Sequence, residues 1–329
     1  MNVEIIAEIA NAHQGKKEVA VDIARQSVSN GADIVKFQMY TADDLLVPNH
    51  ERYLHFKKQS FSISDWDFIF GALSNVKTKI FVDVFGLESF KISKKYDIAG
   101  YKIHFSDLMN TPLLKLVAST GKELLIGSGG ASLKEIHYAI KILKQNGVSK
   151  QKIVLLHGFQ GYPTRIDDTN LERLKEFKRE FKGYADLGIS DHIAGDDVFS
   201  KIIPMMALPY GISFVEKHVT INREQKGVDY YSSLDVKEFK DFVEKFRKAE
   251  LSLGSEKCYS DQELNYRKQV KKKWLAKNNL AKGTIITDDN IIMKRDDSVI
   301  QTLEYSEIIG KELIQNVEEN SVIVDDFLK

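Results

Sequence analysis

The chain has 329 residues, enough for one large domain and a smaller one. Its 47 lysines and arginines balance its 47 aspartates and glutamates, so no global field favours nucleic acid or an anionic membrane, and any anion site must be local. A single cysteine, Cys258, excludes an internal disulfide and a multi-cysteine metal site, and without a secretory signal or a run of about 18 apolar residues the chain is predicted to be soluble and cytoplasmic.

Short β-branched or apolar runs alternate with helical stretches of about 10 to 15 residues, the pattern of βα units around a parallel sheet. The expected strands are Val3–Ile9, Ile34–Gln38, Lys79–Val84, Gly100–His104, Glu123–Ile126, Lys152–His157, Ala185–Ile189 and Ser213–His218. The expected helices are Glu18–Asn30, Ser64–Ser74, Leu87–Lys95, Thr111–Ser119, Leu133–Asn146, Asn170–Phe181, Asp196–Ala207 and Lys237–Leu253. Eight units in about 250 residues predict an α/β fold, a (β/α)8 TIM barrel over residues 1–254.

Polar residues follow nearly every expected strand. In a (β/α)8 barrel the active site lies where the strands end and the βα loops begin. A barrel mouth collects such groups from distant parts of the chain, whereas an ordinary surface scatters them. In chain order they are Glu8, Asn11, Lys36, Gln38, Asp83, Lys102, Asp107, Ser128, His157, Gln160, Tyr162, Asp191, His192, Glu216 and His218.

The composition changes after Leu253. The stretch "GSEKCYSDQELNYRKQVKKK" is polar and charged, and it predicts a partly helical linker over residues 255–273. Short strand and turn signals from Trp274 onward predict a second, small domain over residues 274–329.

Two histidines stand in the tripeptides "SDH" and "EKH", after the seventh and eighth expected strands. These strands are neighbours in a barrel, so His192 and His218 could face each other and hold a divalent metal with open positions for substrate and water. The alternative is that each histidine is simply hydrogen-bonded at its strand end. The paired placement favours the metal site.

Two lysines, Lys36 and Lys102, end the second and fourth expected strands between apolar neighbours. Converging lysines can hold a phosphate or carboxylate group, although each could also be a solvated strand cap. Glu8 ends the first strand and could accept a proton or bind substrate, or it could form a structural salt bridge with a barrel lysine. Ser128–Ser132, "SGGAS", is a plausible anion cradle.

Taken in order, these motifs resemble those of the sialic acid synthase family, that is, of N-acetylneuraminate synthase-like enzymes. The enzymes of this family condense phosphoenolpyruvate with an N-acetylated amino sugar. The resemblance covers nearly the whole chain. It includes "AEIANAHQG", "GADIVKFQ", "LLHGFQGYPT", "LGISDH", "VEKHVT" and "GVDYYSS". The segments "LAKGTIITDDNIIMKR" and "YSEIIGKEL" resemble that family's C-terminal antifreeze-like (SAF) domain.

The resemblance implies a role for each matching position. His192 and His218 match metal ligands, most often for Mn²⁺, with Mg²⁺ or Co²⁺ as alternatives. The matching catalytic residues are Glu8, Lys36 and Lys102. Donor contacts fall on Lys36, Lys102, Ser128, Gln160 and Ser190, and acceptor contacts on Gln38, Asp107, Tyr162 and Asp229. Arg295 matches an arginine that reaches the partner's barrel in a homodimer with swapped C-terminal domains.

The donor site departs from the family pattern. After "YKI", His104 and Phe105 replace a small residue and a serine, and Asp107 replaces a longer carboxylate. Asp83 stands near an expected serine and threonine segment, Gly127 replaces a serine, and Gln160 stands for an asparagine. An aspartate beside a phosphate raises the energy of the complex unless a metal or lysine compensates it.

Three functions are compatible with these motifs and with their departures from the family pattern. The leading one is metal-dependent condensation of phosphoenolpyruvate with an aldose, such as N-acetylmannosamine, a diamino-dideoxy hexose or a non-acetylated sugar, to give a sialic-acid-like nonulosonic acid and phosphate. The second is a metal-dependent lyase or aldolase with a different enol donor. The third is a non-catalytic sugar-binding relative, against which the intact Glu8, Lys36, Lys102, His192 and His218 count.

Overall fold

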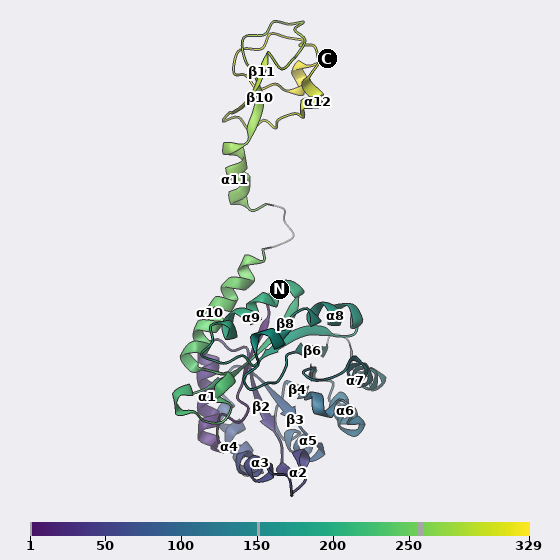
Figure 1. Cartoon of the computed structure of the whole chain (residues 1–329), viewed down its shortest axis with the longest axis vertical. Helices are drawn as coiled ribbons and strands as arrows, with labels where there is room; N and C mark the ends of the chain where they lie inside the picture. The colour runs from purple at the N-terminus through teal and green to yellow at the C-terminus, as the bar shows by residue number, and fades with distance from the viewer. Residues whose placement is uncertain (1, 150–151, 255–258) are drawn as a thin grey trace. The chain divides into compact units, whose positions relative to one another are not determined.

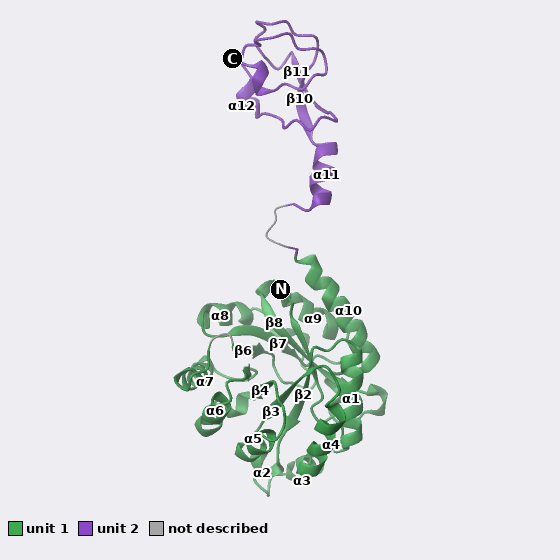
Figure 2. Cartoon of the chain, turned by 180° about the vertical axis from the view of Figure 1, so that it is seen from behind, with its two compact units in different colours: residues 1–253 green, residues 254–329 purple. Residues whose placement is uncertain are grey.

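The structure is a computed structural model that describes residues 2–149, 152–254 and 259–329; Cys258 lies outside them. It divides into two compact units, Met1–Leu253 and Gly254–Lys329, which Figure 2 colours separately. Each unit has its own hydrophobic core. Within the described ranges, no helix combines the length and apolarity needed to cross a membrane.

Eight parallel strands close into a barrel in the first unit, because β1 pairs with both β2 and β8. The strands follow one another around the barrel in chain order, and helices surround them (Figure 1). They are β1 (Glu4–Glu8), β2 (Ile34–Met39), β3 (Lys79–Val84), β4 (Gly100–Ile103), β5 (Glu123–Gly127), β6 (Ile153–His157), β7 (Asp186–Asp191) and β8 (Ile212–Thr220). A short strand, β9 (Ser233–Asp235), pairs with the end of β8. The TIM barrel prediction is confirmed.

All eight expected helices form. They are α1 (Lys17–Ser29), α4 (Ile63–Leu73), α5 (Leu87–Ser93), α6 (Thr111–Ala118), α7 (Leu133–Gln145), α8 (Arg173–Glu180), α9 (Phe199–Met206) and α10 (Val236–Ser252). Capping boxes at Ser62, Ser132 and Asp235 fix the starts of α4, α7 and α10. Two unexpected short helices, α2 (Ala42–Leu45) and α3 (Tyr53–Gln59), lie between β2 and α4.

The inside of the barrel has an apolar layer and a charged layer above it. Side chains alternate along a strand, so residues two positions apart share a face. In β1, Glu8 follows the interior residue Ile6 by two positions, and the same step in β2, β3 and β8 places Lys36, Asp83 and Glu216 above the apolar layer. That layer consists of Ile6, Ile34, Phe81, Leu125, Val154, Leu156 and Phe214.

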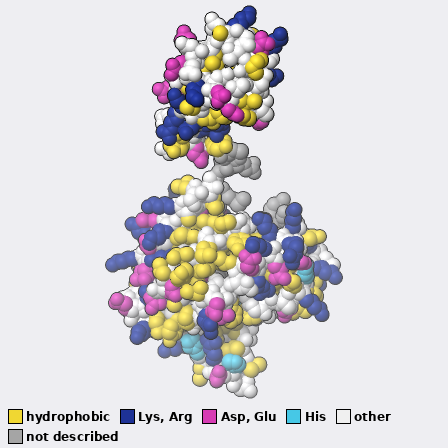
Figure 3. All heavy atoms as spheres, turned by 45° about the horizontal axis from the view of Figure 1, so that its top comes forward, with side chains coloured by type: hydrophobic (Ala, Val, Ile, Leu, Met, Phe, Trp, Pro, Cys, Tyr) yellow, Lys and Arg dark blue, Asp and Glu magenta, His cyan; other side chains and the backbone are white. Residues whose placement is uncertain are grey.

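The second unit is small and is built around one strand pair. It contains α11 (Asp261–Val270), the antiparallel strands β10 (Lys272–Ala276) and β11 (Ile291–Arg295), and α12 (Tyr305–Ile308). Its core consists of Ala276, Leu280, Ile286, Ile291, Ile308, Leu313, Val317 and Ile323. Figure 3 shows both signs of charge interspersed on one face of the molecule, with hydrophobic side chains gathered between them on the barrel unit.

Candidate active site

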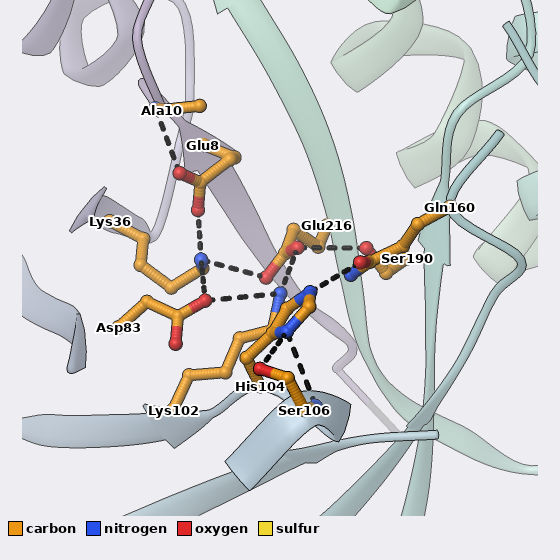
Figure 4. Close-up of polar contacts among 10 residues, drawn as sticks. All are labelled: Glu8, Ala10, Lys36, Asp83, Lys102, His104, Ser106, Gln160, Ser190 and Glu216. Carbon is orange, nitrogen blue, oxygen red and sulfur yellow. Dashed lines mark hydrogen bonds and ion pairs between the residues drawn. The ribbon is translucent and has the colours of Figure 1, made fainter. Parts of the chain in front are cut away.

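Five charged side chains from five strands form a buried network at the carboxyl end of the barrel (Figure 4). Each is at most 3% exposed. Charges buried in this way must be paired, since transferring an unpaired charge out of water is very unfavourable. The five are Glu8, Lys36, Asp83, Lys102 and Glu216.

Each lysine of the network has a close carboxylate partner. Lys36 is paired with Glu8, and its Nζ also lies 3.4 Å from Oε2 of Glu216. Lys102 donates a hydrogen bond to Oε1 of Glu216 at 2.8 Å, and the Ser190 hydroxyl donates to the same oxygen at 2.8 Å. The structure thus contains the salt bridge between Glu8 and a barrel lysine that was the alternative to a catalytic role.

Asp83 is held more loosely than the other two acids. Its Oδ2 lies 3.7 Å from the ammonium nitrogens of both Lys36 and Lys102. Neither of its oxygens has a hydrogen-bond partner among the described residues. Most buried polar groups are hydrogen-bonded, so this carboxylate is an exception.

The network shifts the pKa values of its members in different directions. Burial raises the pKa of the Glu8 carboxyl to about 7, although Lys36 opposes the shift. Burial acts in the same direction on Glu216, but Lys102 and Lys36 together outweigh it and hold the pKa of Glu216 below its usual range. Burial lowers the pKa of Lys36, yet the surrounding carboxylates more than compensate, so the net pKa is raised and the lysine stays charged.

The two predicted metal ligands face each other beside this network. The ring centroids of His192 and His218 are 5.0 Å apart, and the Tyr162 ring lies 5.2 and 5.9 Å from them. Both histidines are buried, and neither Nδ1 has a hydrogen-bond partner within the described ranges. Burial lowers the pKa of His192 to about 3 and that of His218 well below its usual value, so both rings are neutral.

Neutral imidazoles with free lone pairs are suitable ligands for a divalent metal. In the part of the chain that the structure describes, no group of three or more His, Cys, Asp or Glu side chains is arranged to hold a metal ion. A metal held by His192 and His218 would therefore keep several coordination positions for substrate and water.

A second buried ion pair fixes these strand ends from the opposite face. Asp191 and Lys217 pair across β7 and β8, and both are almost completely buried. Because neighbours along a strand point to opposite faces, this pair lies behind the inward-facing Ser190, His192 and Glu216. It helps to hold the register that brings those residues together.

A cavity of about 610 Å³ opens over the barrel mouth. Gln38, Tyr162 and Asp229, three of the predicted acceptor contacts, line it. Asp229 is anchored there because its carboxylate accepts a hydrogen bond from the backbone N–H of Asn11 at 2.9 Å. The other described residues around the cavity are Asn11, Tyr40, Leu45, Arg52, His55, Phe56, Phe85, His104, Ser106, Gln160, Gly227, Val228 and Tyr231.

The two remaining acceptor predictions lie elsewhere. The carboxylate of Asp107 accepts a hydrogen bond from the side-chain amide of Asn110 at 2.8 Å, in the turn after β4, and is not among the described residues that line the cavity. Arg295 ends β11 in the second unit and is exposed. The roles of both residues stay predictions.

Two loops meet through His104 and Gln160. His104 follows β4 and donates from Nε2 to the side-chain oxygen of Gln160, which follows β6, while its Nδ1 is 2.8 Å from the Ser106 hydroxyl. Phe85 and Phe105 flank the imidazole, with ring centroids 5.5 and 4.6 Å away. Gln160, a predicted donor contact, is therefore engaged by a residue that departs from the family pattern.

The two serines predicted to contact the donor both donate hydrogen bonds to other residues of the barrel. Ser128 directs its hydroxyl to the Leu156 carbonyl at 2.8 Å, and Ser190 bonds Glu216. Glu216 is central to the network, although the sequence motifs assign it no role. The signal for it is its position two residues before His218, on the same inward face of β8.

Comparison with known proteins gives consistent matches over both units. The NeuB family model matches residues 23–258 and the SAF domain model residues 275–329. The chain is 31% identical to an uncharacterized protein of Methanocaldococcus jannaschii over 98% of this chain and 94% of that one. It is 30% identical to the N,N'-diacetyllegionaminic acid synthase of Legionella pneumophila, again over 98% and 94%. The crystal structure of an N-acetylneuraminic acid (sialic acid) synthetase from Leptospira borgpetersenii has a TM-score of 0.73 and 26% identity, covering 81% of this chain and 92% of that one.

Proposed function

The chain belongs to the NeuB family and is an enzyme of the sialic acid synthase type, and from this premise we propose that it condenses phosphoenolpyruvate with an aldose to give a nonulosonic acid and phosphate. One observation carries the proposal. Two buried lysines, Lys36 and Lys102, lie at the same end of the barrel as the neutral pair His192 and His218. The first pair suits an anionic donor, and the second suits a metal.

The donor would lie against the lysine pair. Lys36 and Lys102 would hold its phosphate and carboxylate groups, because compact ammonium charges can be directed at the oxygens of such anions. Both lysines approach from neighbouring parts of the barrel and share Glu216 as a counter-charge. This shared carboxylate orients the two ammonium groups before a donor arrives.

His192 and His218 would hold a divalent ion, with Mn²⁺ as the first candidate. When bound, such an ion acts as a Lewis acid that polarises a carbonyl oxygen of the acceptor. The Asp191–Lys217 pair would maintain the spacing of the two imidazoles from behind.

The reaction forms one carbon–carbon bond and one carbon–oxygen bond to water, and it breaks the carbon–oxygen bond to the bridging oxygen of the phosphate. The methylene carbon of phosphoenolpyruvate attacks the aldehyde carbon of the open-chain sugar, and water adds to the former enol carbon. Phosphate then leaves with the bridging oxygen. Glu8, in its ionised form, would stabilise the positive charge that develops at the enol carbon or orient the water.

The acceptor would occupy the cavity above the network. Its wall combines hydrogen-bonding groups on Gln38, Asp229 and Asn11 with aromatic rings of Tyr40 and Tyr162, a combination suited to a polyhydroxylated ligand. An N-acetylated amino sugar or a diamino-dideoxy hexose fits this class.

We include a homodimer in the proposal. Large hydrophobic side chains on and beside α9 are exposed, namely Val198 (62%), Phe199 (39%), Ile202 (37%) and Met206 (52%). An apolar helix face of this kind is typical of a protein contact surface. Arg295 of the partner chain would then complete the acceptor site, as the family resemblance implies.

A metal-dependent lyase or aldolase with a different enol donor is the second candidate, and Asp83 is the observation that favours it. A third carboxylate near the lysines disfavours a phosphorylated donor. The two candidates differ in their products: only the synthase releases phosphate.

The test is product analysis with a panel of aldoses, phosphoenolpyruvate and Mn²⁺. The synthase predicts a product with the mass of the aldose plus pyruvic acid, formed from phosphoenolpyruvate and not from pyruvate. His192→Ala should abolish both Mn²⁺ binding and this product, whereas the exposed His137→Ala should change neither. Retained Mn²⁺ binding and product formation in His192→Ala would contradict the metal site.

A further inference from the structure

The buried network holds one more acid than base. Glu8 is the close partner of Lys36, and Glu216 accepts a hydrogen bond from Lys102 at 2.8 Å. Each lysine therefore has a carboxylate of its own. Asp83 is the surplus member, since its Oδ2 lies 3.7 Å from both ammonium nitrogens.

The surroundings of Asp83 do not hold it as they hold the other two acids. Glu8 accepts a backbone N–H and Glu216 accepts a serine hydroxyl, each at 2.8 Å. Asp83 is fully buried, but neither of its oxygens has a hydrogen-bond partner among the residues described. Among the described residues, its ion-pair partners are the two lysines, each at 3.7 Å.

We propose that Asp83 acts as an internal competitor for Lys36 and Lys102, and so sets the charge of the donor that this site accepts. The proposal rests on the proposed function, in which these lysines hold the donor. An incoming anion must share the ammonium groups with a carboxylate that cannot leave the chain. Repulsion between like charges is strong in a buried site and increases with the charge of the ligand.

The substrate class follows from this competition. Asp83 should weaken donor binding more strongly as the negative charge of the donor increases, so phosphoenolpyruvate should bind more weakly than the lysine pair alone would allow. Pyruvate, with a single negative charge, should be affected less by Asp83 than phosphoenolpyruvate is.

Asp83→Asn tests the proposal because it removes the charge and retains the shape of the side chain. At about pH 8, above the pKa of about 7 of the Glu8 carboxyl, the variant keeps two ionised carboxylates for two lysines, so it leaves no excess buried charge. In calorimetric titrations with Mn²⁺ present, we expect the dissociation constant of phosphoenolpyruvate to fall by about tenfold or more, since a like charge within about 4 Å is removed. The constant for pyruvate should fall by a smaller factor.

Two further variants keep the test independent of folding and of net charge. Asp83→Ser removes the same charge with a smaller side chain and should also tighten phosphoenolpyruvate binding. Asp186→Asn changes the net charge equally, but Asp186 is exposed at the opposite end of β7. It should leave both dissociation constants as they are in the wild type.

The outcomes separate this proposal from the proposed function. If the wild type releases phosphate but neither Asp83 variant binds phosphoenolpyruvate more tightly, the competitor role is wrong and the synthase stands. If both variants bind it more tightly but no protein releases phosphate with any aldose, the competitor role is supported and the synthase fails. Failure of all three proteins to bind phosphoenolpyruvate overturns both.

Discussion

Lys36 contacts all three acids of the buried network. It lies within ion-pair distance of Glu8, Asp83 and Glu216, all of them buried. Lys36→Met would leave these three acids with a single lysine, and removing one partner of a buried pair costs about 3 to 5 kcal/mol. We expect a loss of that size in the free energy of unfolding, measured by urea denaturation.

A matched control for this substitution is Lys79→Met. Lys79 pairs with Glu4, but its side chain is 47% exposed. An exposed pair contributes at most about 1 kcal/mol. Equal losses in the two variants would contradict the stabilising role assigned to Lys36.

Glu8 gives the stability a dependence on pH. Burial raises its pKa from 4.5 to about 7, so between these values the folded protein retains a proton that the unfolded chain has lost. The stabilisation is complete below about pH 4.5 and is lost as the pH rises to about 7. Between about pH 5 and pH 8 the wild type should lose roughly 2 to 3 kcal/mol relative to Glu8→Gln, at about 1.4 kcal/mol per unit. If denaturation curves show that the free energy of unfolding changes equally with pH in the wild type and in Glu8→Gln, the assigned role of Glu8 is wrong.

For single residues, the sequence predicted which side chains belong to the site better than it predicted the contacts that these side chains make. Glu8, Lys36 and Lys102 were predicted as site residues, and the structure places all three in one network. That Glu216 joins both lysines could not be predicted, because the contact depends on the interior faces of strands far apart in the chain. The same holds for His104, whose bond to Gln160 depends on how two loops approach each other.

Among the elements, the loop after β6 packs tightly against the end of β7. A Cβ atom on Gly158 would lie 1.9 Å from the Ser190 carbonyl oxygen. Gly158→Ala must therefore displace Ser190, which bonds Glu216. We expect destabilisation by about 1 to 3 kcal/mol in thermal or urea unfolding, together with weaker donor binding.

Gly71→Ala is the matched control for the Gly158→Ala substitution. Gly71 lies inside α4, and a Cβ atom there would have no heavy atom within 4 Å apart from its chain neighbours and the backbone of its own helix. Because alanine is the better helix former, this variant should gain roughly 0.5 to 1 kcal/mol. A destabilised Gly71→Ala or a neutral Gly158→Ala would contradict the packing described.

The elements themselves were largely predictable, for physical reasons. Each barrel strand is a short apolar run between turn residues, and each principal helix carries a continuous apolar stripe, so local periodicity suffices. The helices α2 and α3 were missed because they are short and the connection between them contains Pro48, so no periodic pattern develops. β9 has three residues and forms only because β8 offers it a partner.

At the scale of the whole molecule, the proposed homodimer with swapped C-terminal domains makes a distinctive prediction. His192→Ala and Arg295→Ala should each be inactive alone. In an equal mixture of the two chains, half of the dimers are mixed, and in each mixed dimer one of two sites has an intact barrel and an intact partner arginine. Coexpression should therefore restore about a quarter of the wild-type activity. No recovery, with mixed dimers present, would show that each site uses its own chain's Arg295, and full activity of Arg295→Ala alone would show that no site uses it.

The most direct measurement is phosphate release from phosphoenolpyruvate, with and without Mn²⁺, against a panel of N-acetylated and plain aldoses. We predict release only when both the metal and one particular sugar are present, because in the proposed reaction the lysine pair holds the donor and the histidine pair holds the metal that acts on the acceptor. No release with any sugar, from a protein that binds Mn²⁺ tightly, would contradict the synthase and would favour a non-phosphorylated donor.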